Sequence, residues 1–231
     1  MPDEGARLRP ARKETLASSV YERMREGIIT GSFAPGEKLH IQNLSNEFAV
    51  GLSPVREALS RLSTEGLVLQ SDHRGFAVRP LSEEDLTDLT RARCWLNELA
   101  LRQSIARGDA AWEEAVLIAF HRMSRTPRYE SPDQQQRSPA WEQAHRVFHA
   151  TLISACGCRR LEHYCEHLFD SAERYRHVAR RAGVVGGNRS QEHRALMEAA
   201  LARDADQAVA LLNAHFEHTA TLVRKMLAAT P

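Results

Sequence analysis

The sequence predicts a mainly α-helical protein in two domains: three helices with a two-stranded hairpin, then an all-α antiparallel bundle of about six helices. Three observations predict this fold class. Apolar residues recur at helical spacing along most of the chain. Two short apolar stretches, 67–69 and 76–78, have the character of strands. A chain of 231 residues is long enough for two domains of ordinary size.

The first predicted domain, residues 13–79, begins with two helices. Over 13–30 an apolar residue stands at every fourth position, and Gly31 then ends the pattern. A turn at 33–36, which contains a Pro-Gly pair, separates this helix from a compact second helix over 41–48. Two helices joined by a tight connection are therefore expected at the start of the domain.

A third helix should open at Ser53-Pro54, because serine is a good N-cap and proline fits the first helical position. This helix is expected to run to Gly66. The two apolar stretches that follow are separated by a polar segment, 71–75, whose glycine favours a β-hairpin. Three helices and a hairpin in this order form a winged helix-turn-helix.

The second domain should start after a break at 79–82, where the acidic run Glu83-Glu84-Asp85 suits the first turn of a helix. We assign residues 80–231 to this domain. Beyond the boundary the spacing of apolar residues predicts helices only. The expected helices cover roughly 83–107, 109–124, 138–156, 159–181, 189–203 and 204–227.

Composition argues against several classes of protein. No apolar run approaches the roughly 20 residues that cross a bilayer, and the N-terminus lacks the apolar core of a signal peptide, so we expect a cytoplasmic protein without membrane contact. The four cysteines form no CxxC pair, which indicates reduced, structural cysteines. The net charge of +1 decides nothing about nucleic acid. Residues 1–12 are interpreted as a flexible basic arm, which either follows a phosphate backbone or is a solvated tail.

The most informative short stretch is 53–59, Ser-Pro-Val-Arg-Glu-Ala-Leu. It resembles the signature of the recognition helix in the GntR superfamily of bacterial regulators. Further segments agree in the expected order over about residues 16–78. They are Pro35-Gly36-Glu37-Lys38-Leu39, Glu65-Gly66-Leu67-Val68 and Arg74-Gly75-Phe76-Ala77-Val78. The resemblance implies a winged helix-turn-helix that binds double-stranded operator DNA.

The resemblance also implies which residues contact DNA. They are Ser53, Pro54 and Arg56 on the recognition helix, with His73, Arg74 and Gly75 at the wing. Arg56 lies in the first turn, where it can reach a guanine or a phosphate. The alternative is a salt-bridged Arg56, paired with Glu57 or Glu26. Leu52 departs from the family, which usually has arginine there, so the operator sequence cannot be transferred from other members.

Four histidines share the apolar faces of predicted helices: His145, His149, His193 and His215. A single histidine in such a place is more often an ordinary core residue. Two at i and i+4 can chelate one metal, however, and burying several imidazoles without a partner is costly. A shared metal or a shared anion is the economical explanation. The sequence therefore predicts a divalent transition metal, zinc or nickel, held by these four residues.

The second half of the chain resembles the FCD domain of the FadR subfamily. Metal-binding members carry Asp-x3-His, a further His, and another His 22 residues later. Here the pattern is His145-x3-His149, then His193 and His215 at that spacing, so His145 stands where aspartate is common and makes the site less anionic. Residues 145–176 resemble CsiR-like regulators most closely.

The FCD resemblance implies a small carboxylate or dicarboxylate effector, glutarate-like in shape, bound at or near the metal. Arg93 and Arg174 are the candidate effector-binding residues, although either would serve equally as a surface salt-bridge residue. The family usually has glutamate four residues after the first arginine, and here the residue is Asn97. We expect a differently tuned cavity.

The sequence is compatible with three functions. The first is a ligand-responsive homodimeric regulator, with repression expected over activation. The second is a metal-dependent enzyme, against which no acid or base stands out beside the histidines, and no HExxH or Gly-x-Ser-x-Gly motif is present. The third is a constitutive DNA-binding protein with a purely structural metal.

Overall fold

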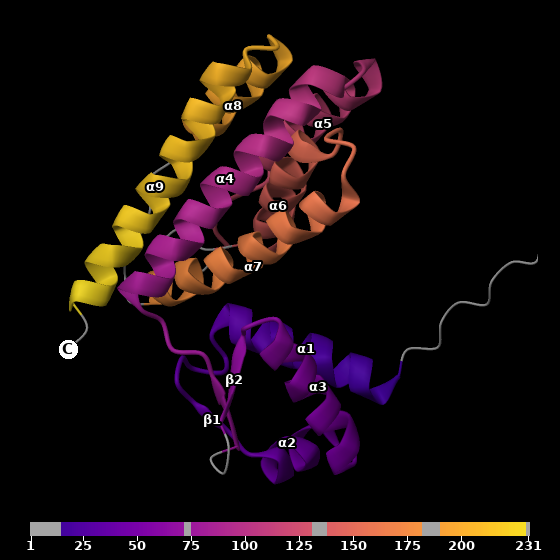
Figure 1. Cartoon of the computed structure of the whole chain (residues 1–231), viewed down its shortest axis with the longest axis vertical. Helices are drawn as coiled ribbons and strands as arrows, with labels where there is room; N and C mark the ends of the chain where they lie inside the picture. The colour runs from indigo at the N-terminus through magenta and orange to yellow at the C-terminus, as the bar shows by residue number, and fades with distance from the viewer. Residues whose placement is uncertain (1–14, 72–74, 131–137, 182–189, 230–231) are drawn as a thin grey trace, which may run out of the picture. The chain divides into compact units, whose positions relative to one another are not determined.

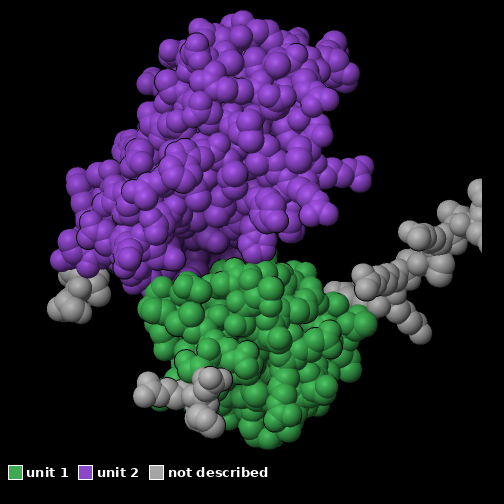
Figure 2. Space-filling model, viewed as in Figure 1, with its two compact units in different colours: residues 1–28, 32–80 green, residues 29–31, 81–231 purple. Residues whose placement is uncertain are grey.

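The computed structural model describes residues 15–71, 75–130, 138–181 and 190–229 and divides the chain into two compact units (Figures 1 and 2). The first comprises residues 1–28 and 32–80, the second residues 29–31 and 81–231. Among the described residues, every helix is too short or too polar to cross a membrane. The predicted fold class is confirmed for both units: a winged helix-turn-helix and an all-helical domain.

The first unit holds three helices and a small antiparallel sheet. The elements are α1 (Leu16–Thr30), β1 (Lys38–Leu39), α2 (Ile41–Phe48), α3 (Leu52–Thr64), β2 (Val68–Ser71) and β3 (Gly75–Val78). The strand order is β1-β3-β2, with Leu39 opposite Phe76 and Val68 opposite Val78. The hairpin was predicted, but β1 was not. Two residues are too few to show alternation, and β1 exists only because β3 offers it an edge.

The start of α3 differs from the prediction. The helix begins at Leu52, with Gly51 in an extended conformation as its N-cap, so the prediction of Ser53 as the cap was wrong. Pro54 therefore occupies the third helical position. The physical reason is that amide N–H groups of the whole first turn lack helical partners, so proline is tolerated there and does not fix the first residue.

The described residues of the second unit form the six expected helices. They are α4 (Glu83–Arg107), α5 (Ala110–Arg125), α6 (Pro139–Ile153), α7 (Arg159–Arg181), α8 (Ser190–Leu201) and α9 (Ala205–Ala229). Ser82 caps α4 by accepting a hydrogen bond from the Asp85 amide at 3.1 Å, and Asp109 caps α5 through the Trp112 amide at 3.0 Å. Helices α4 and α9 run side by side, and α7 also packs on α4 (Figure 1).

The interior of this unit is unusually polar near its middle. The apolar core of this unit includes Leu101, Phe148, Leu152, Leu196 and Leu212. The inward face of α4, however, also buries Thr90, Arg93, Asn97 and Ser104, which follow one another at helical spacing. Charged and amide groups are seldom buried without a partner or a purpose. This polar stripe marks where a ligand site should be sought.

Candidate functional site

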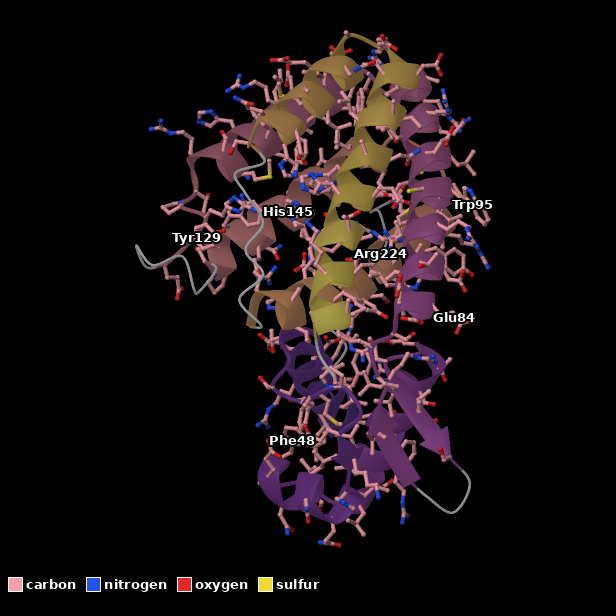
Figure 3. The ribbon with its side chains drawn as sticks, turned by 90° about the vertical axis from the view of Figure 1, so that its left-hand side faces the viewer. Phe48, Glu84, Trp95, Tyr129, His145 and Arg224 are labelled. Atoms are coloured by element: carbon pink, nitrogen blue, oxygen red, sulfur yellow. The ribbon has the colours of Figure 1, made fainter. Side chains whose placement is uncertain are left out.

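Three helices bring the four predicted histidines together. Helix α6 places His145 and His149 one turn apart on its inward face, α8 supplies His193 and α9 supplies His215. All four side chains are buried, and one ligating nitrogen from each lies within 4.8 Å of the others. The Nε2 atoms of His145 and His149 are 3.1 Å apart. Figure 3 shows His145 directed into the interior of the bundle.

The surroundings prepare these imidazoles to act as ligands. Burial, and after it the neighbouring imidazoles, lowers the pKa of His145 and of His149 well below the usual range, which keeps their lone pairs available. His215 Nδ1 donates to a carboxylate oxygen of Glu192 at 2.9 Å, which leaves Nε2 as its ligating nitrogen. Sequence reasoning found no acid beside the histidines. Glu192 directly precedes His193 in the sequence, but its hydrogen bond is to His215, 23 residues later, and no local spacing indicates that contact.

The donor set fits a transition metal. A zinc–nitrogen bond is about 2.0–2.1 Å long, so two nitrogens bound to one ion lie about 3–3.4 Å apart. The 3.1 Å separation of His145 and His149 agrees with this. Four neutral imidazoles suit zinc, nickel, copper or iron rather than magnesium or calcium, which prefer oxygen. Because none of the four ligands is anionic, an ion held there would keep its full positive charge toward a further ligand.

Two cavities adjoin the histidine cluster from different sides. The larger, of about 280 Å³, has His149, Arg93, Asn97 and Arg146 in its wall. The smaller, of about 60 Å³, is lined by His145, His193 and His215 together with charged residues of α6 and α7. The charges of α6 and α7 already pair with one another, since Arg180 binds Glu142 at 2.7 Å and Arg176 binds Glu173, and the guanidinium of Arg128, which also lines this cavity, lies over the Trp141 ring, 5.1 Å from its centroid. The larger cavity is therefore the better place for a small ligand.

Arg93 is the charged group of the larger cavity that lacks an acidic partner. Its side chain is 4 % exposed and forms no ion pair with any described residue, and its guanidinium stacks over Phe216, 3.9 Å from the ring centroid. The side-chain amide of Asn97, one turn later, donates to the Arg93 backbone carbonyl oxygen at 3.0 Å and forms no hydrogen bond with the guanidinium. Burial, followed by the charge of Arg176, lowers the pKa of Arg93 to about 9. The group is thus still a cation at neutral pH.

The other arginines differ from Arg93. Arg146 of α6 also lines the larger cavity but is paired with the buried Asp170, and sequence reasoning missed both residues because neither belongs to a recognisable spacing. Arg174 of α7, the second predicted effector residue, is buried but is not among the residues that line either cavity. The structure therefore brings Arg93, and not Arg174, to the histidines.

The predicted DNA-binding residues of α3 lie on its outward face. Val55, Ala58, Leu59 and Leu62 are buried, whereas Ser53 and Arg56 are exposed and Pro54 is half-buried. Arg56 forms no ion pair with any described residue, so the salt-bridged alternative finds no support there. Leu52 is exposed at the first position of the same helix.

The wing residues are described in part. Gly75 is exposed, has a φ of +78° and would have no atom within 4 Å of an added Cβ, so backbone conformation and not crowding accounts for the glycine. His73, Arg74 and the predicted basic arm of residues 1–12 lie outside the described residues.

Comparison with known proteins agrees with this geometry. Residues 16–78 match the family described as bacterial regulatory proteins, gntR family, and residues 88–218 match the FCD domain. The chain is 38% identical over 215 residues to the HTH-type transcriptional regulator BphR of Paraburkholderia xenovorans (strain LB400), covering 93% of this chain and 88% of that protein. It is 32% identical over 212 residues to the HTH-type transcriptional repressor GlaR of Escherichia coli (strain K12), covering 90% and 96%.

Solved structures share the fold. A putative transcriptional regulator GntR from Rhodococcus sp. RHA1 superposes with a TM-score of 0.71 at 24% identity, covering 90% of this chain and 97% of that one. E. coli McbR/YncC gives a TM-score of 0.70 at 16% identity, covering 92% and 99%. The relatives named here are regulators, which decides against the metal-dependent enzyme.

Proposed function

Since the chain belongs to the GntR family of bacterial regulatory proteins and carries an FCD domain, it is a DNA-binding transcriptional regulator, and we propose that it is a repressor released from its operator by a small carboxylate bound in the larger cavity. The observation that carries this proposal is Arg93, a buried guanidinium without an acidic partner among the described residues. A charge in that position is stabilised by an incoming anion.

The histidine cluster supports the same ligand class. A divalent ion held by His145, His149, His193 and His215 would supply positive charge and a coordination position for a carboxylate oxygen. His149 lines the same cavity as Arg93, so one carboxylate could contact both the metal ion and the Arg93 guanidinium. Arg93 offers the planar fork that matches a carboxylate. Zinc and nickel remain the expected metals, and the glutarate-like shape expected of the effector makes glutarate the reference acid for the assay.

Operator release tests the proposal. A duplex selected by the purified protein from a random-sequence pool would be bound by metal-loaded full-length protein and titrated with glutarate and other short acids. Release at submillimolar acid is the supporting result. If no acid alters operator affinity although metal is bound, the third function, a constitutive DNA-binding protein with a structural metal, is the correct one.

DNA binding should depend on Arg56. Replacing Arg56 with alanine is expected to weaken affinity for the selected duplex about 5- to 150-fold, since a good base contact contributes about 1–3 kcal/mol. Electrophoretic mobility shift measures the change. Arg122→Ala, an exposed arginine of α5 with the same loss of charge, should leave affinity within about twofold. If both variants lost the same operator affinity, the effect would come from the change in net charge, and Arg56 would have no specific contact with DNA.

A homodimer is part of the proposal, and α4 offers a self-complementary face. Trp95 is 66 % exposed and Leu99 is 51 % exposed on the side of α4 away from the core, where Figure 3 shows Trp95 pointing outward. Asp88 and Arg102 stand seven residues before and after Trp95. An antiparallel pairing of two α4 helices about Trp95 would therefore set Asp88 against Arg102 of the partner subunit.

Replacing Trp95 and Leu99 with serine should convert the dimer to monomer, with a dissociation constant raised at least about 30-fold because buried aromatic anchors commonly contribute about 2 kcal/mol or more. Sedimentation equilibrium gives the measurement. Leu117→Ser, at an apolar residue of α5 that is 46 % exposed, is the control. A double variant that dimerises as the parent does would place the interface elsewhere.

A further inference from the structure

We propose that the effector is a zwitterion, which binds with its carboxylate at Arg93 and presents a cationic group to Glu162 and Glu166 at the opposite end of the larger cavity. This inference rests on the proposed function and narrows its ligand class. The earlier expectation allowed a carboxylate or a dicarboxylate without distinction. The charges along the cavity wall distinguish between them.

The two ends of the cavity differ in depth and in charge. Arg93, Asn97 and His149 are all buried and form the inner end. At the outer end Glu166 is exposed and Glu162 is half-buried, both on α7. The inner end is therefore cationic and the outer end anionic.

No basic residue of the cavity wall neutralises the outer end. Within the described residues, the side chain of Glu162 accepts one bond, from the Cys156 thiol at 3.5 Å, and Glu166 forms no ion pair. Arg146, the other arginine of the wall, is already engaged by Asp170. Two carboxylates thus line the cavity without an ion pair to any described residue, and so does the guanidinium of Arg93.

The rise of helix α7 sets the spacing along the cavity wall. Phe169 of α7 packs against the rings of His145 and His149, with centroids 5.8 and 6.1 Å away, and marks the inner end. Glu166 and Glu162 precede Phe169 by three and seven residues, so they lie about 4.5 and 10 Å farther along the helix axis. Cys165 also lines the cavity, where burial raises the pKa of its thiol to about 12, while the charges of Arg93 and Glu162 shift that pKa in opposite directions. A chain of four or five carbons bridges such a span.

A second carboxylate at the outer end would face Glu162 and Glu166 and be repelled, whereas an ammonium group would be attracted to them. A terminal methyl group, as in pentanoate, would be neither repelled nor attracted. The cavity is thus expected to rank three five-carbon acids in the order 5-aminopentanoate, then pentanoate, then glutarate. The volume of about 280 Å³ suits molecules of this size, at the lower limit of ordinary ligand pockets.

Isothermal titration of the metal-loaded, full-length protein with these three acids tests the ranking. We expect 5-aminopentanoate to bind about tenfold more tightly than glutarate, the gain of one charge-assisted hydrogen bond. The double variant Glu162→Gln, Glu166→Gln should abolish this preference and tighten glutarate binding. Glu114→Gln, at an exposed residue of α5 that lines neither cavity, should behave as the parent protein does.

Each outcome decides the inference. Glutarate binding as tightly as 5-aminopentanoate, or a preference that survives in the double variant, would overturn it and leave the proposed function intact. If none of the three acids binds and none releases the operator, the proposed carboxylate effector fails, and the zwitterion fails with it.

Discussion

Replacing His149 and His193 with alanine is expected to remove the metal from the protein. The two residues come from different helices, α6 and α8, and each contributes a nitrogen to the buried cluster, so the variant retains only two donors. Metal per chain, measured by mass spectrometry of the dialysed protein, should fall from about one to nearly zero.

The same variant separates metal binding from folding. Metal in hundredfold excess over its dissociation constant stabilises the native state by about 2.7 kcal/mol, or roughly 5–10 °C in a domain of this size. A chelator should remove this stabilisation from the parent protein and lower its melting temperature, and the melting temperature of the variant should not respond to the chelator. His121→Ala with His163→Ala, two exposed histidines outside the cluster, is the matched control. Equal metal content in variant and parent would refute the assignment of the metal site to these histidines and would leave the assignment of the DNA-binding residues unaffected.

Replacing Arg93 with methionine should abolish effector response while leaving operator binding intact. Methionine preserves the apolar stem that packs on Phe216 but removes the cation. Loss of one partner of a buried charge pair costs about 2–4 kcal/mol, so the affinity for the acid should fall roughly 30- to 1000-fold. Titration calorimetry and operator release both report the change.

The controls distinguish a lost ligand contact from a damaged fold. Arg93→Met removes a buried charge that lacks an acidic partner among the described residues, so the ligand-free variant should melt no lower than the parent. Arg91→Met, on the exposed side of the same helix where Arg91 pairs with Asp88, should keep full response. Asn97→Glu would place an acid one turn from Arg93 and is expected to compete with the effector. An Arg93→Met protein with unchanged acid affinity would refute the cavity assignment.

Much of this architecture was accessible from the sequence because it depends on periodicity. The six helices of the second unit and the inward placement of the four histidines both follow from apolar residues at helical spacing. The wing hairpin followed from two apolar stretches flanking a glycine-containing turn. These features are local in the chain, so a single sequence contains their signal.

The remainder depends on contacts between distant segments. Strand β1 forms because β3 is beside it, and Glu192 matters because α9 brings His215 within 2.9 Å. The histidine spacing predicted the cluster, and the family resemblance put Arg93 before Arg174, but no spacing in the sequence excluded Arg174. Only the packing of α4 against α9, which stacks Arg93 on Phe216, separates the two.

The isolated guanidinium on α4 also makes the search for the natural effector practicable. Its positive charge is energetically unfavourable in the empty protein, and any molecule that neutralises it should raise the melting temperature. A library of metabolites can therefore be screened by dye-monitored melting, an assay that requires no operator DNA.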